Sequence, residues 1–365
     1  MALTNLAALL RKAAKSFYWY SAASMDSRIL ETLKELYGFS DPQPLPGAAS
    51  GFSGSNFLVL DGEVNYFVKR YHFFLTTDEI REIHAVKFLY KSNDIPAITP
   101  LHNINKESFF VIGNYHYAVF PYVIGKSFAV PSARAVASMG ENLARQHFVS
   151  MNHLDVLKNK KEFKGWNEAE FMEDTNQMLA RVAAAEPKTD FDIEAEAFIR
   201  QKVSIAARYP TRFEELDLRN EYIIHGDFHQ YNVFFSEDDT VSHVFDFERV
   251  ARGPRAVDVV SSLFTTCFYF AKVGGASLEE QYRLAESYLA GYHQTYPLIR
   301  RELEDAITWY FLGDLARTHW IEGEWYVGKN PRVKVQLPDR RAWVTYFAEN
   351  FDHIKERLMG YVFPE

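Results

Sequence analysis

YIIHGDFHQYNVFFSEDDTVSHVFDFER, residues 222–249, is the stretch that decides the fold. The short apolar runs Tyr222–Ile224 and Val233–Phe235 are typical of buried strands, and they hold the polar loop HGDFHQYN from both sides. After an acidic turn, a further apolar run at Val241–Phe245 predicts a hairpin. The hairpin delivers Asp246 at its end, so we expect it to bring polar side chains of the loop close to this carboxylate.

Three polar side chains of this stretch suit a hard cation: Asp227, Asn232 and Asp246. Mg²⁺ takes oxygen ligands and is usually held by one or two carboxylates plus substrate phosphates. An Asp five residues before an Asn is the catalytic-loop spacing of kinases, in which the Asp accepts the proton of the attacking hydroxyl. We assign that role to Asp227, and metal binding to Asn232 and Asp246. The alternative is an acidic hairpin whose Asp and Asn only cap turns.

Two segments carry a resemblance to a known family. HGDFHQYNVFF, followed by VFDFERVARGPRAVDV, resembles the catalytic-loop motif and metal-Asp segment of the aminoglycoside phosphotransferase and choline kinase superfamily, which are small-molecule kinases. The resemblance implies an α+β, protein-kinase-like bilobal fold with an antiparallel sheet and one helix in the N-lobe and a mostly helical C-lobe. It also implies ATP and Mg²⁺ as cofactors, and a structural role for Gly253, Pro254 and Asp258, the last tying the loop down.

Asp246-Phe247-Glu248 stands where protein kinases carry Asp-Phe-Gly, and no long activation segment follows. A small acceptor is therefore favoured over a protein. By the same resemblance, residues 26–120 form the nucleotide-binding N-lobe and residues 121–365 the catalytic and acceptor-binding C-lobe. Residues 1–25 form an extension, helical or disordered, for which a docking helix, an organellar-type leader and sequence upstream of a start at Met25 stay open.

The phosphate-binding residues are expected in the N-lobe. Ser53 and Gly54 lie in a run of small residues that lets backbone amides approach phosphates. Lys69 follows on the strand YFVKRY, where alternation places it on one face with Phe67 and Tyr71, and an inward lysine is costly unless it meets an anion. The alternative is a surface lysine on an edge strand, with the next residue, an arginine, pointing inward. Phe67 is larger than the residue that the family places beneath the adenine.

A helix glutamate orients the lysine in kinases. Residues 77–91 predict an amphipathic helix in which Glu82 is the preferred candidate and Glu79 the second. Phe120, Tyr122 and Val123 are assigned by position to the lobe linker, whose backbone groups bind the adenine edge in the resembling kinases.

The acceptor-binding residues are sought among polar side chains near the catalytic loop and in the late helices. Aromatic walls with carboxylates suit an aminated or polyhydroxy acceptor. His147 and His225 are interpreted as scaffold, and His229 mainly so. The candidates are His229, Glu248, Asp314, Arg317, Glu322 and Glu324.

The composition sets further bounds. The 365 residues are 47% hydrophobic and 24% charged, as in soluble globular chains, and the net charge of -8 argues against nucleic acid as a partner. The single cysteine, Cys267, excludes an intrachain disulfide framework and lies in an apolar run, so we expect a buried thiol. No apolar run approaches membrane-spanning length, and we expect a cytoplasmic protein without a membrane partner. The sequence does not indicate an oligomeric state.

The sequence thus predicts an ATP-dependent O-phosphotransferase acting on a small hydroxylated molecule. An aminoglycoside, an amino alcohol, homoserine and a sugar all remain open as acceptors. The alternatives are a pseudokinase-like nucleotide-binding protein and a protein kinase.

Overall fold

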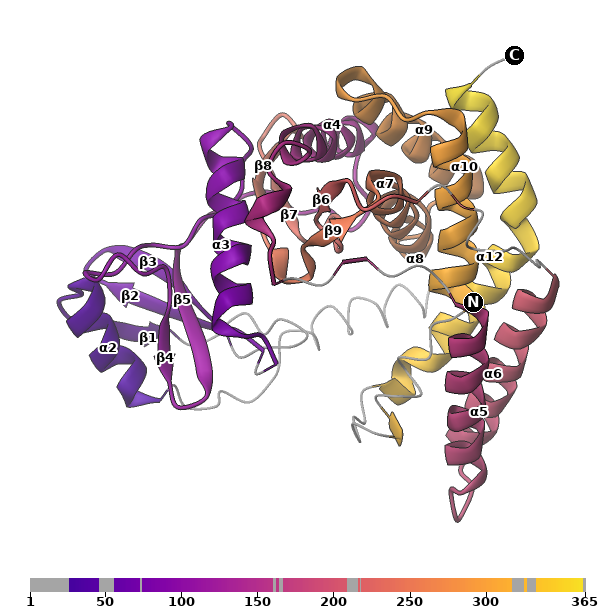
Figure 1. The fold of residues 1–365 in the computed structure, drawn as a ribbon, viewed down its shortest axis with the longest axis horizontal. Helices are drawn as coiled ribbons and strands as arrows, with labels where there is room; N and C mark the ends of the chain where they lie inside the picture. Colours follow the sequence, from indigo (N-terminus) through magenta and orange to yellow (C-terminus); the bar gives the residue numbers. More distant parts are fainter. Residues whose placement is uncertain are drawn as a thin grey trace. The chain divides into compact units, whose positions relative to one another are not determined.

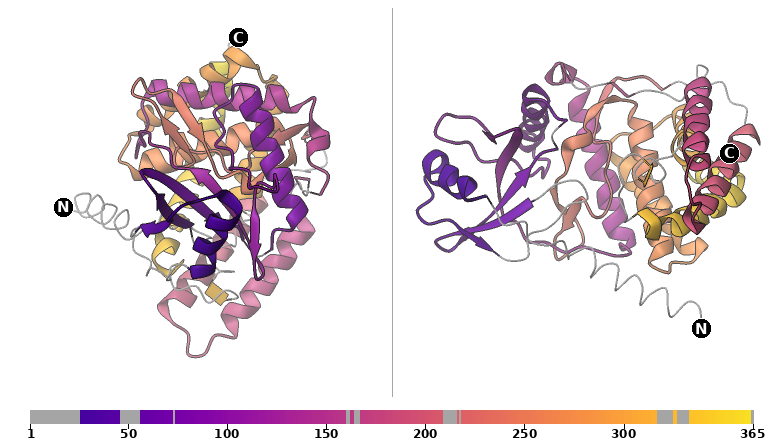
Figure 2. Two further views of the ribbon diagram at one scale, coloured as in Figure 1. Left: turned by 90° about the vertical axis from the view of Figure 1, so that its left-hand side faces the viewer. Right: turned by 90° about the horizontal axis from the view of Figure 1, so that it is seen from below.

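The structure is a computed structural model, and its chain forms two compact units that are described separately (Figures 1 and 2). The first unit holds residues 1–129, 152–161 and 230–250, and the second holds the rest. The residues described are 26–45, 56–72, 74–159, 162–163, 167–208, 216, 218–316, 325–326 and 333–363, without the side chains of 314–316. The predictions for residues 1–25, Ser53, Gly54, Arg317, Glu322, Glu324 and the side chain of Asp314 lie outside them.

The first unit is built on a five-stranded antiparallel sheet in the order β1-β2-β3-β5-β4. Among the described residues of this unit, two helices accompany the sheet, α2 (Ser27–Tyr37) and α3 (Thr77–Ser92). This is the predicted N-lobe sheet with a helix, preceded by α2. The strands are β1 (Gln43–Leu45), β2 (Asn56–Asp61), β3 (Val64–Arg70), β4 (Phe110–Ile112) and β5 (Tyr115–Pro121).

The two faces of this sheet have different partners. On one face Val68 is fully buried in a core with Leu33 of α2. Because side chains alternate along a strand, Lys69 points to the other face. That face meets α3, where the buried His84 bonds the hydroxyl of Tyr71 at 2.7 Å and packs edge-on against the ring of Phe120. The inward direction predicted for the lysine is confirmed, and Arg70 belongs to the α2 face.

A small hairpin also belongs to the first unit. β7 (Val233–Phe235) and β8 (Val241–Val244) pair antiparallel, with Val233 opposite Val244 and a bulge between Phe234 and Phe235. This confirms the predicted hairpin. The first unit therefore extends beyond the expected boundary at residue 120, because it takes in 230–250 from far along the chain.

The second unit is mostly helical, as expected for the C-lobe. A two-stranded ladder, β6 (Tyr222–Ile224) with β9 (Ala251–Gly253), lies among its helices. Its helices are α4 (Ala133–Ser150), α5 (Glu168–Ala183), α6 (Asp190–Arg208), α7 (Arg255–Leu263), α8 (Ala271–Val273), α9 (Leu278–Thr295), α10 (Arg300–Trp309) and α12 (Val333–Val362).

Glycines let α4 and α9 approach closely. A Cβ on Gly140 of α4 would lie 2.1 Å from the carbonyl oxygen of Tyr288, and one on Gly291 of α9 would lie 2.0 Å from the carbonyl oxygen of Ala137. These helices carry His147 and Tyr292, whose side chains bond at 2.9 Å in the interior. The glycines therefore set the helix spacing at which this buried pair forms.

Two π-helical segments interrupt the second unit, at Phe264–Phe270 and Tyr310–Ala316. The rings of Phe264 and Tyr310 stack across them with centroids 4.8 Å apart. Cys267 is fully buried, which confirms the expected thiol environment. The stretch Arg255–Val273 is long and apolar enough to cross a membrane, contrary to the expectation from the sequence, but 67% of it is buried within the protein. Such burial is typical of the core helix of a globular protein.

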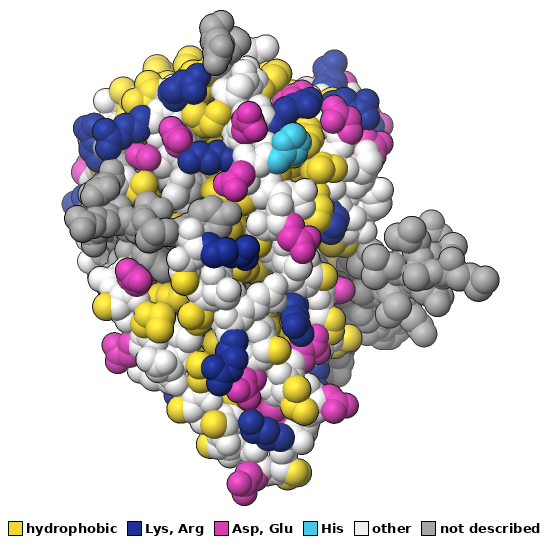
Figure 3. All heavy atoms as spheres, turned by 90° about the vertical axis from the view of Figure 1, so that its right-hand side faces the viewer, with side chains coloured by type: hydrophobic (Ala, Val, Ile, Leu, Met, Phe, Trp, Pro, Cys, Tyr) yellow, Lys and Arg dark blue, Asp and Glu magenta, His cyan; other side chains and the backbone are white. Residues whose placement is uncertain are grey.

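The surface carries both signs of charge. On the face drawn in Figure 3, lysine and arginine side chains lie among aspartate and glutamate side chains, with hydrophobic groups scattered between them. Ion pairs of the second unit such as Arg200 with Glu196, 2.9 Å, and Arg357 with Glu286, 2.9 Å, follow this pattern. On this face the acidic side chains are therefore interspersed with basic ones and do not form a patch of one sign.

Candidate active site

An ion-paired cluster lies on the α3 face of the sheet in the first unit. The Lys69 ammonium lies 2.8 Å from Asp246 Oδ1 and 2.5 Å from Glu248 Oε1. The Lys69 side chain is 15% exposed and that of Glu248 17%. Burial works against a charged Lys69, but the carboxylates of Asp246 and Glu248 outweigh it and raise the pKa of the lysine. The structure thus joins the predicted phosphate lysine to the predicted metal ligand, although they are 177 positions apart.

Asp246 adopts an unusual backbone conformation. Its φ of 65° and ψ of 54° lie in the left-handed region, two residues after the end of β8 and directly before the turn of 3₁₀ helix at Phe247–Arg249. Non-glycine residues rarely adopt this conformation, which costs about 1–3 kcal/mol and is concentrated at functional sites. The strained backbone turns the chain sharply at the residue predicted to bind metal.

Asn232 lies at the same end of the hairpin as Asp246. It is 7% exposed, directly precedes β7, and its carbonyl accepts the N–H of Phe245 at 3.1 Å. An amide and a carboxylate at one hairpin end fit a hard cation that completes its shell with phosphates and water. Among the described residues no three His, Cys, Asp or Glu side chains gather as a metal cage.

The expected partnership of Lys69 with Glu82 is not the one that the structure forms. The buried Glu82 carboxylate accepts the backbone N–H groups of Lys158 and Asn159 and the side-chain amide of Asn159, at 2.8 to 3.0 Å. Three donors from one loop hold it there. Glu79, the second candidate, closes the capping box of α3 with Thr76. The carboxylate beside Lys69 that the helix was expected to supply comes from Glu248, which we had placed among the acceptor contacts.

Lys87 is a residue of this cluster that sequence reasoning missed. It is 3% exposed, and its Nζ lies 4.4 Å from the ring centroid of Phe120 and 5.6 Å from that of Phe247. Burial, reinforced by the charge of Lys69, lowers the pKa of Lys87 to about 7. The sequence signal is a lysine beside the apolar residues of the helix predicted over residues 77–91.

The adenine side of the predicted site is partly visible. Phe120 is 4% exposed and pairs with Phe67 across β5 and β3, with ring centroids 6.5 Å apart. The backbone N–H of Tyr122 donates to the carbonyl of Asn65 at 3.3 Å, while Val123 continues the chain beyond β5. The first unit thus holds the predicted linker, Lys69, Asn232 and Asp246.

The loop that carries Asp227 is fixed within the second unit. The buried carboxylate of Asp258 accepts the N–H groups of His225 at 2.7 Å and Gly226 at 2.9 Å, and lies 3.2 Å from His147 Nε2. Burial opposes this charge, but the bonds to His147 and the nearby His225 lower the pKa of Asp258 below its usual value. The expected tying role of Asp258 and the scaffold role of His147 both agree with this geometry.

Gly226, with a φ of 75°, makes the turn before Asp227, where a side chain would be strained. The N–H of Asp227 lies 3.3 Å from His225 Nδ1, so His225 props the loop as expected. His229 Nε2 lies 3.6 Å from Asp227 Oδ1, and its ring packs edge-on against Phe270 at 5.7 Å. His229 is thus placed beside the predicted base, while Asp314 is described only as a backbone position in a π-helix.

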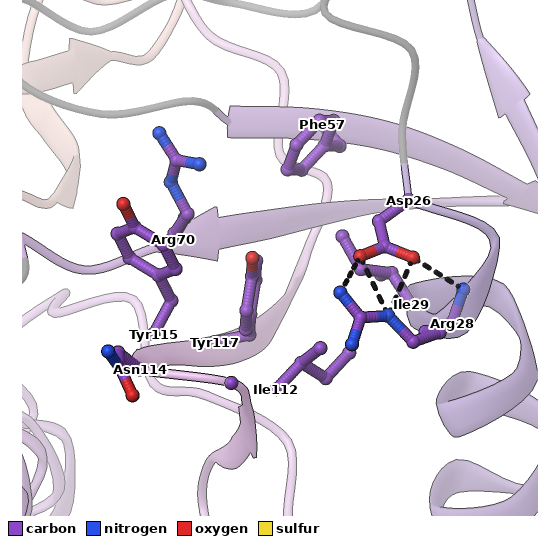
Figure 4. Close-up of a pocket in the computed structure, with 10 residues that line it drawn as sticks. Asp26, Arg28, Ile29, Phe57, Arg70, Ile112, Asn114, Tyr115 and Tyr117 are labelled. Carbon is purple, nitrogen blue, oxygen red and sulfur yellow. Dashed lines mark hydrogen bonds and ion pairs between the residues drawn. The ribbon is translucent and has the colours of Figure 1, made fainter.

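A cavity of about 360 Å³ lies elsewhere in the first unit (Figure 4). It is lined by residues of the α2 face of the sheet, among them Arg70, whose guanidinium lies 4.6 Å from the ring centroid of Tyr115. Lys69 points to the opposite face. This cavity is therefore separate from the predicted phosphate site.

These features define a class of protein. A small antiparallel sheet with an inward lysine, a hairpin carrying Asn232 and Asp246, and a helical unit holding the HGD loop are the parts of a protein-kinase-like phosphotransferase. The sequence pattern of the phosphotransferase enzyme family matches residues 45–301, which is more than half of the chain. The chain belongs to this family, and the predicted superfamily and fold class are confirmed.

Known relatives give the same picture. The chain is 24% identical over 244 residues to a homoserine kinase of Rhodospirillum rubrum, an alignment covering 66% of this chain and 69% of the relative. A microcompartment-associated aminopropanol kinase is similar in structure, with a TM-score of 0.61, 16% identity and coverage of 90% of this chain and 98% of the other. A spectinomycin phosphotransferase in complex with ADP and spectinomycin is also similar, with a TM-score of 0.59, 14% identity and coverage of 92% of this chain and 98% of the other. The chain is thus similar to small-molecule kinases.

Proposed function

We propose that this chain transfers the γ-phosphate of ATP to a hydroxyl group of a small molecule. The observation that carries the proposal is the ion pair of Lys69 with Asp246, at 2.8 Å, at the hairpin end where Asn232 also lies. A lysine and a metal-binding carboxylate held together are what a kinase needs to neutralise the β- and γ-phosphates.

Each residue has a distinct task in this mechanism. Lys69 binds the phosphates, Asn232 and Asp246 supply oxygen ligands, and Asp227 accepts the proton of the acceptor hydroxyl. Mg²⁺, when bound, would draw negative charge from the transferring phosphate. The amides of His225 and Gly226, fixed by Asp258, keep the loop of Asp227 in place.

We propose an amino alcohol of the homoserine type as the acceptor. The support is the similarity to a homoserine kinase in sequence and to an aminopropanol kinase in fold, since both names describe small molecules with an amine and a hydroxyl. Aminoglycosides and sugars remain the comparison substrates.

The test is an ADP-release assay with MgATP over homoserine, aminopropanol, choline, aminoglycosides and sugars. We expect turnover with one amino alcohol, reduced at least about 100-fold in Asp227→Asn, the usual contribution of a general base. The matched control is Asp155→Asn, which changes an exposed carboxylate outside the loop. Turnover of an amino alcohol that survives Asp227→Asn unchanged would contradict the mechanism, and turnover of other acceptors alone would contradict the acceptor class.

A further inference from the structure

A chain of three buried side chains joins separate elements of the first unit. The imidazole of His84, on α3, bonds the hydroxyl of Tyr71 through Nε2 at 2.7 Å and the hydroxyl of Ser108 through Nδ1 at 2.7 Å. Tyr71 directly follows β3, and its N–H continues the ladder to β5 by donating to the carbonyl of His116 at 2.9 Å. One imidazole therefore fixes α3 both to the end of β3 and to the segment that precedes β4.

A histidine is a demanding residue for this place. Burial, together with the charges of Lys87 and Lys69, lowers the pKa of His84 well below its usual value, so the ring is neutral. A neutral imidazole donates from one nitrogen and accepts at the other, so each nitrogen needs a partner with the matching role. An apolar side chain would pack against Phe109 and Phe120 without that requirement. The two bonds therefore indicate a task beyond filling the core.

The bond to Tyr71 acts next to the predicted phosphate lysine. Lys69 and Tyr71 are two positions apart in an extended segment, so their side chains point to the same face. The Lys69 ammonium lies 5.6 Å from the centroid of the Tyr71 ring. A shift of this ring relative to α3 would therefore move the wall against which the lysine lies.

This link stands where kinases use an ion pair, in which a helix glutamate orients the lysine. Here the amides of Lys158 and Asn159 hold Glu82, and Lys69 is paired with carboxylates that lie outside α3. The inference rests on the proposed function. We propose that His84 is a positioning residue of the nucleotide site, which holds the strand of Lys69 against α3 through Tyr71 and so places the ammonium for the phosphates.

The test measures ADP and adenosine binding by calorimetry on the full chain, in EDTA so that metal binding does not contribute. Tyr71→Phe removes the hydroxyl and keeps the ring. We expect it to weaken ADP binding at least about fivefold, because a displaced ammonium loses part of its charge-assisted contact with the phosphates. Adenosine, which has no phosphate, should bind the variant and the parent alike.

The matched control is Thr77→Val. It removes another hydroxyl–imidazole bond of α3, the one of 2.8 Å to His116, which lies on β5 and not on the lysine strand. The control should bind ADP as the parent does.

Two further comparisons separate positioning from stability alone. Adding Tyr71→Phe to Lys69→Met should cause no further loss of ADP affinity, because residues that act through one another are not additive. His84→Leu should weaken ADP binding as Tyr71→Phe does, and His84→Gln should restore it, since the amide can still bond the Tyr71 hydroxyl.

Several outcomes would overturn the inference. These are an unchanged ADP affinity in Tyr71→Phe, equal losses for ADP and adenosine, and a further loss in the Lys69→Met background. A loss in Thr77→Val as large as that in Tyr71→Phe, or ADP binding by His84→Gln as weak as by His84→Leu, would do so too. Failure of the parent chain to bind ADP, or parent-like ADP binding by Lys69→Met, would instead overturn the proposed function.

Discussion

Gly291→Ala should lower stability through a single added methyl group. The new Cβ would lie 2.0 Å from the carbonyl oxygen of Ala137, whereas ordinary contact begins at 3.4 Å, so the helices must separate by about 1.4 Å locally. Overpacking of a tight interior costs about 1–3 kcal/mol, and the gain in helix propensity from Gly to Ala returns about 1 kcal/mol. Because a backbone atom cannot rotate away, we take the upper cost and expect a net loss of roughly 2 kcal/mol.

The assay is thermal and urea unfolding, with turnover measured beside them. A loss of this size should lower Tm by roughly 2–3 °C for a chain of 365 residues. The residue after Gly291 is Tyr292, which bonds His147, so we also expect a lower kcat through the Asp258 network. Gly360→Ala on α12 is the matched control, because its Cβ would meet nothing within 4 Å and should leave Tm equal or higher. Equal stability of Gly291→Ala and the parent would refute the close-approach argument.

Three shorter predictions concern buried charge. Asp258→Asn should lower kcat about 10- to 100-fold and should also lower Tm. The pKa of Asp258 in the folded chain lies below its ordinary 3.8, so the stabilisation by this carboxylate is present above that pH and is lost in more acid solution. The Tm of the variant should therefore depend less on pH in acid solution than the Tm of the parent does. Asp246→Asn should reduce kcat by at least about 1,000-fold while Tm changes little, because Asn tolerates the left-handed conformation; wild-type turnover by this variant would be incompatible with the metal role. Lys87→Met should raise Tm at pH 7, because the lysine pKa is about 7 in the folded chain and 10.5 in the unfolded chain. The difference in Tm between variant and parent should shrink as the pH rises between these values, and a difference independent of pH would contradict the reasoning. The other titratable groups that act on or lie near Lys87 are His84, Lys69, Asp246 and Glu248.

The elements with strong periodicity were predictable from the sequence. The helix predicted at residues 77–91 and the hairpin around the acidic turn match the structure because each has a clear apolar face or alternation. The start of α5 is not marked by apolar periodicity alone, because Glu162 is taken into a bridge with Arg252 and the helix begins only at Glu168. The strand β9 is three residues long and exists only because β6 pairs with it, so no local pattern marks it.

The long helix α12 was not predicted at all. Its 30 residues include Pro338, which reads as a break in the sequence, and its buried residues are spread over many turns.

In the site, the residue types were predictable from the sequence, but the carboxylate that pairs with Lys69 was not. Spacing along α3 selects Glu82, but only the folded chain shows that loop amides hold Glu82 and that Glu248 reaches Lys69.

The two π-helices carry a consequence for how such an enzyme changes acceptor. A π-turn holds one residue more than an α-turn, so removing one residue from such a segment restores α-helical turns there and leaves the flanking helices in register. Phe270, whose ring meets His229, ends the first segment, and Asp314 lies within the second. A one-residue deletion in the first segment would therefore re-aim several of its side chains at once, Phe270 beside His229 among them, while the rest of the fold stays in register.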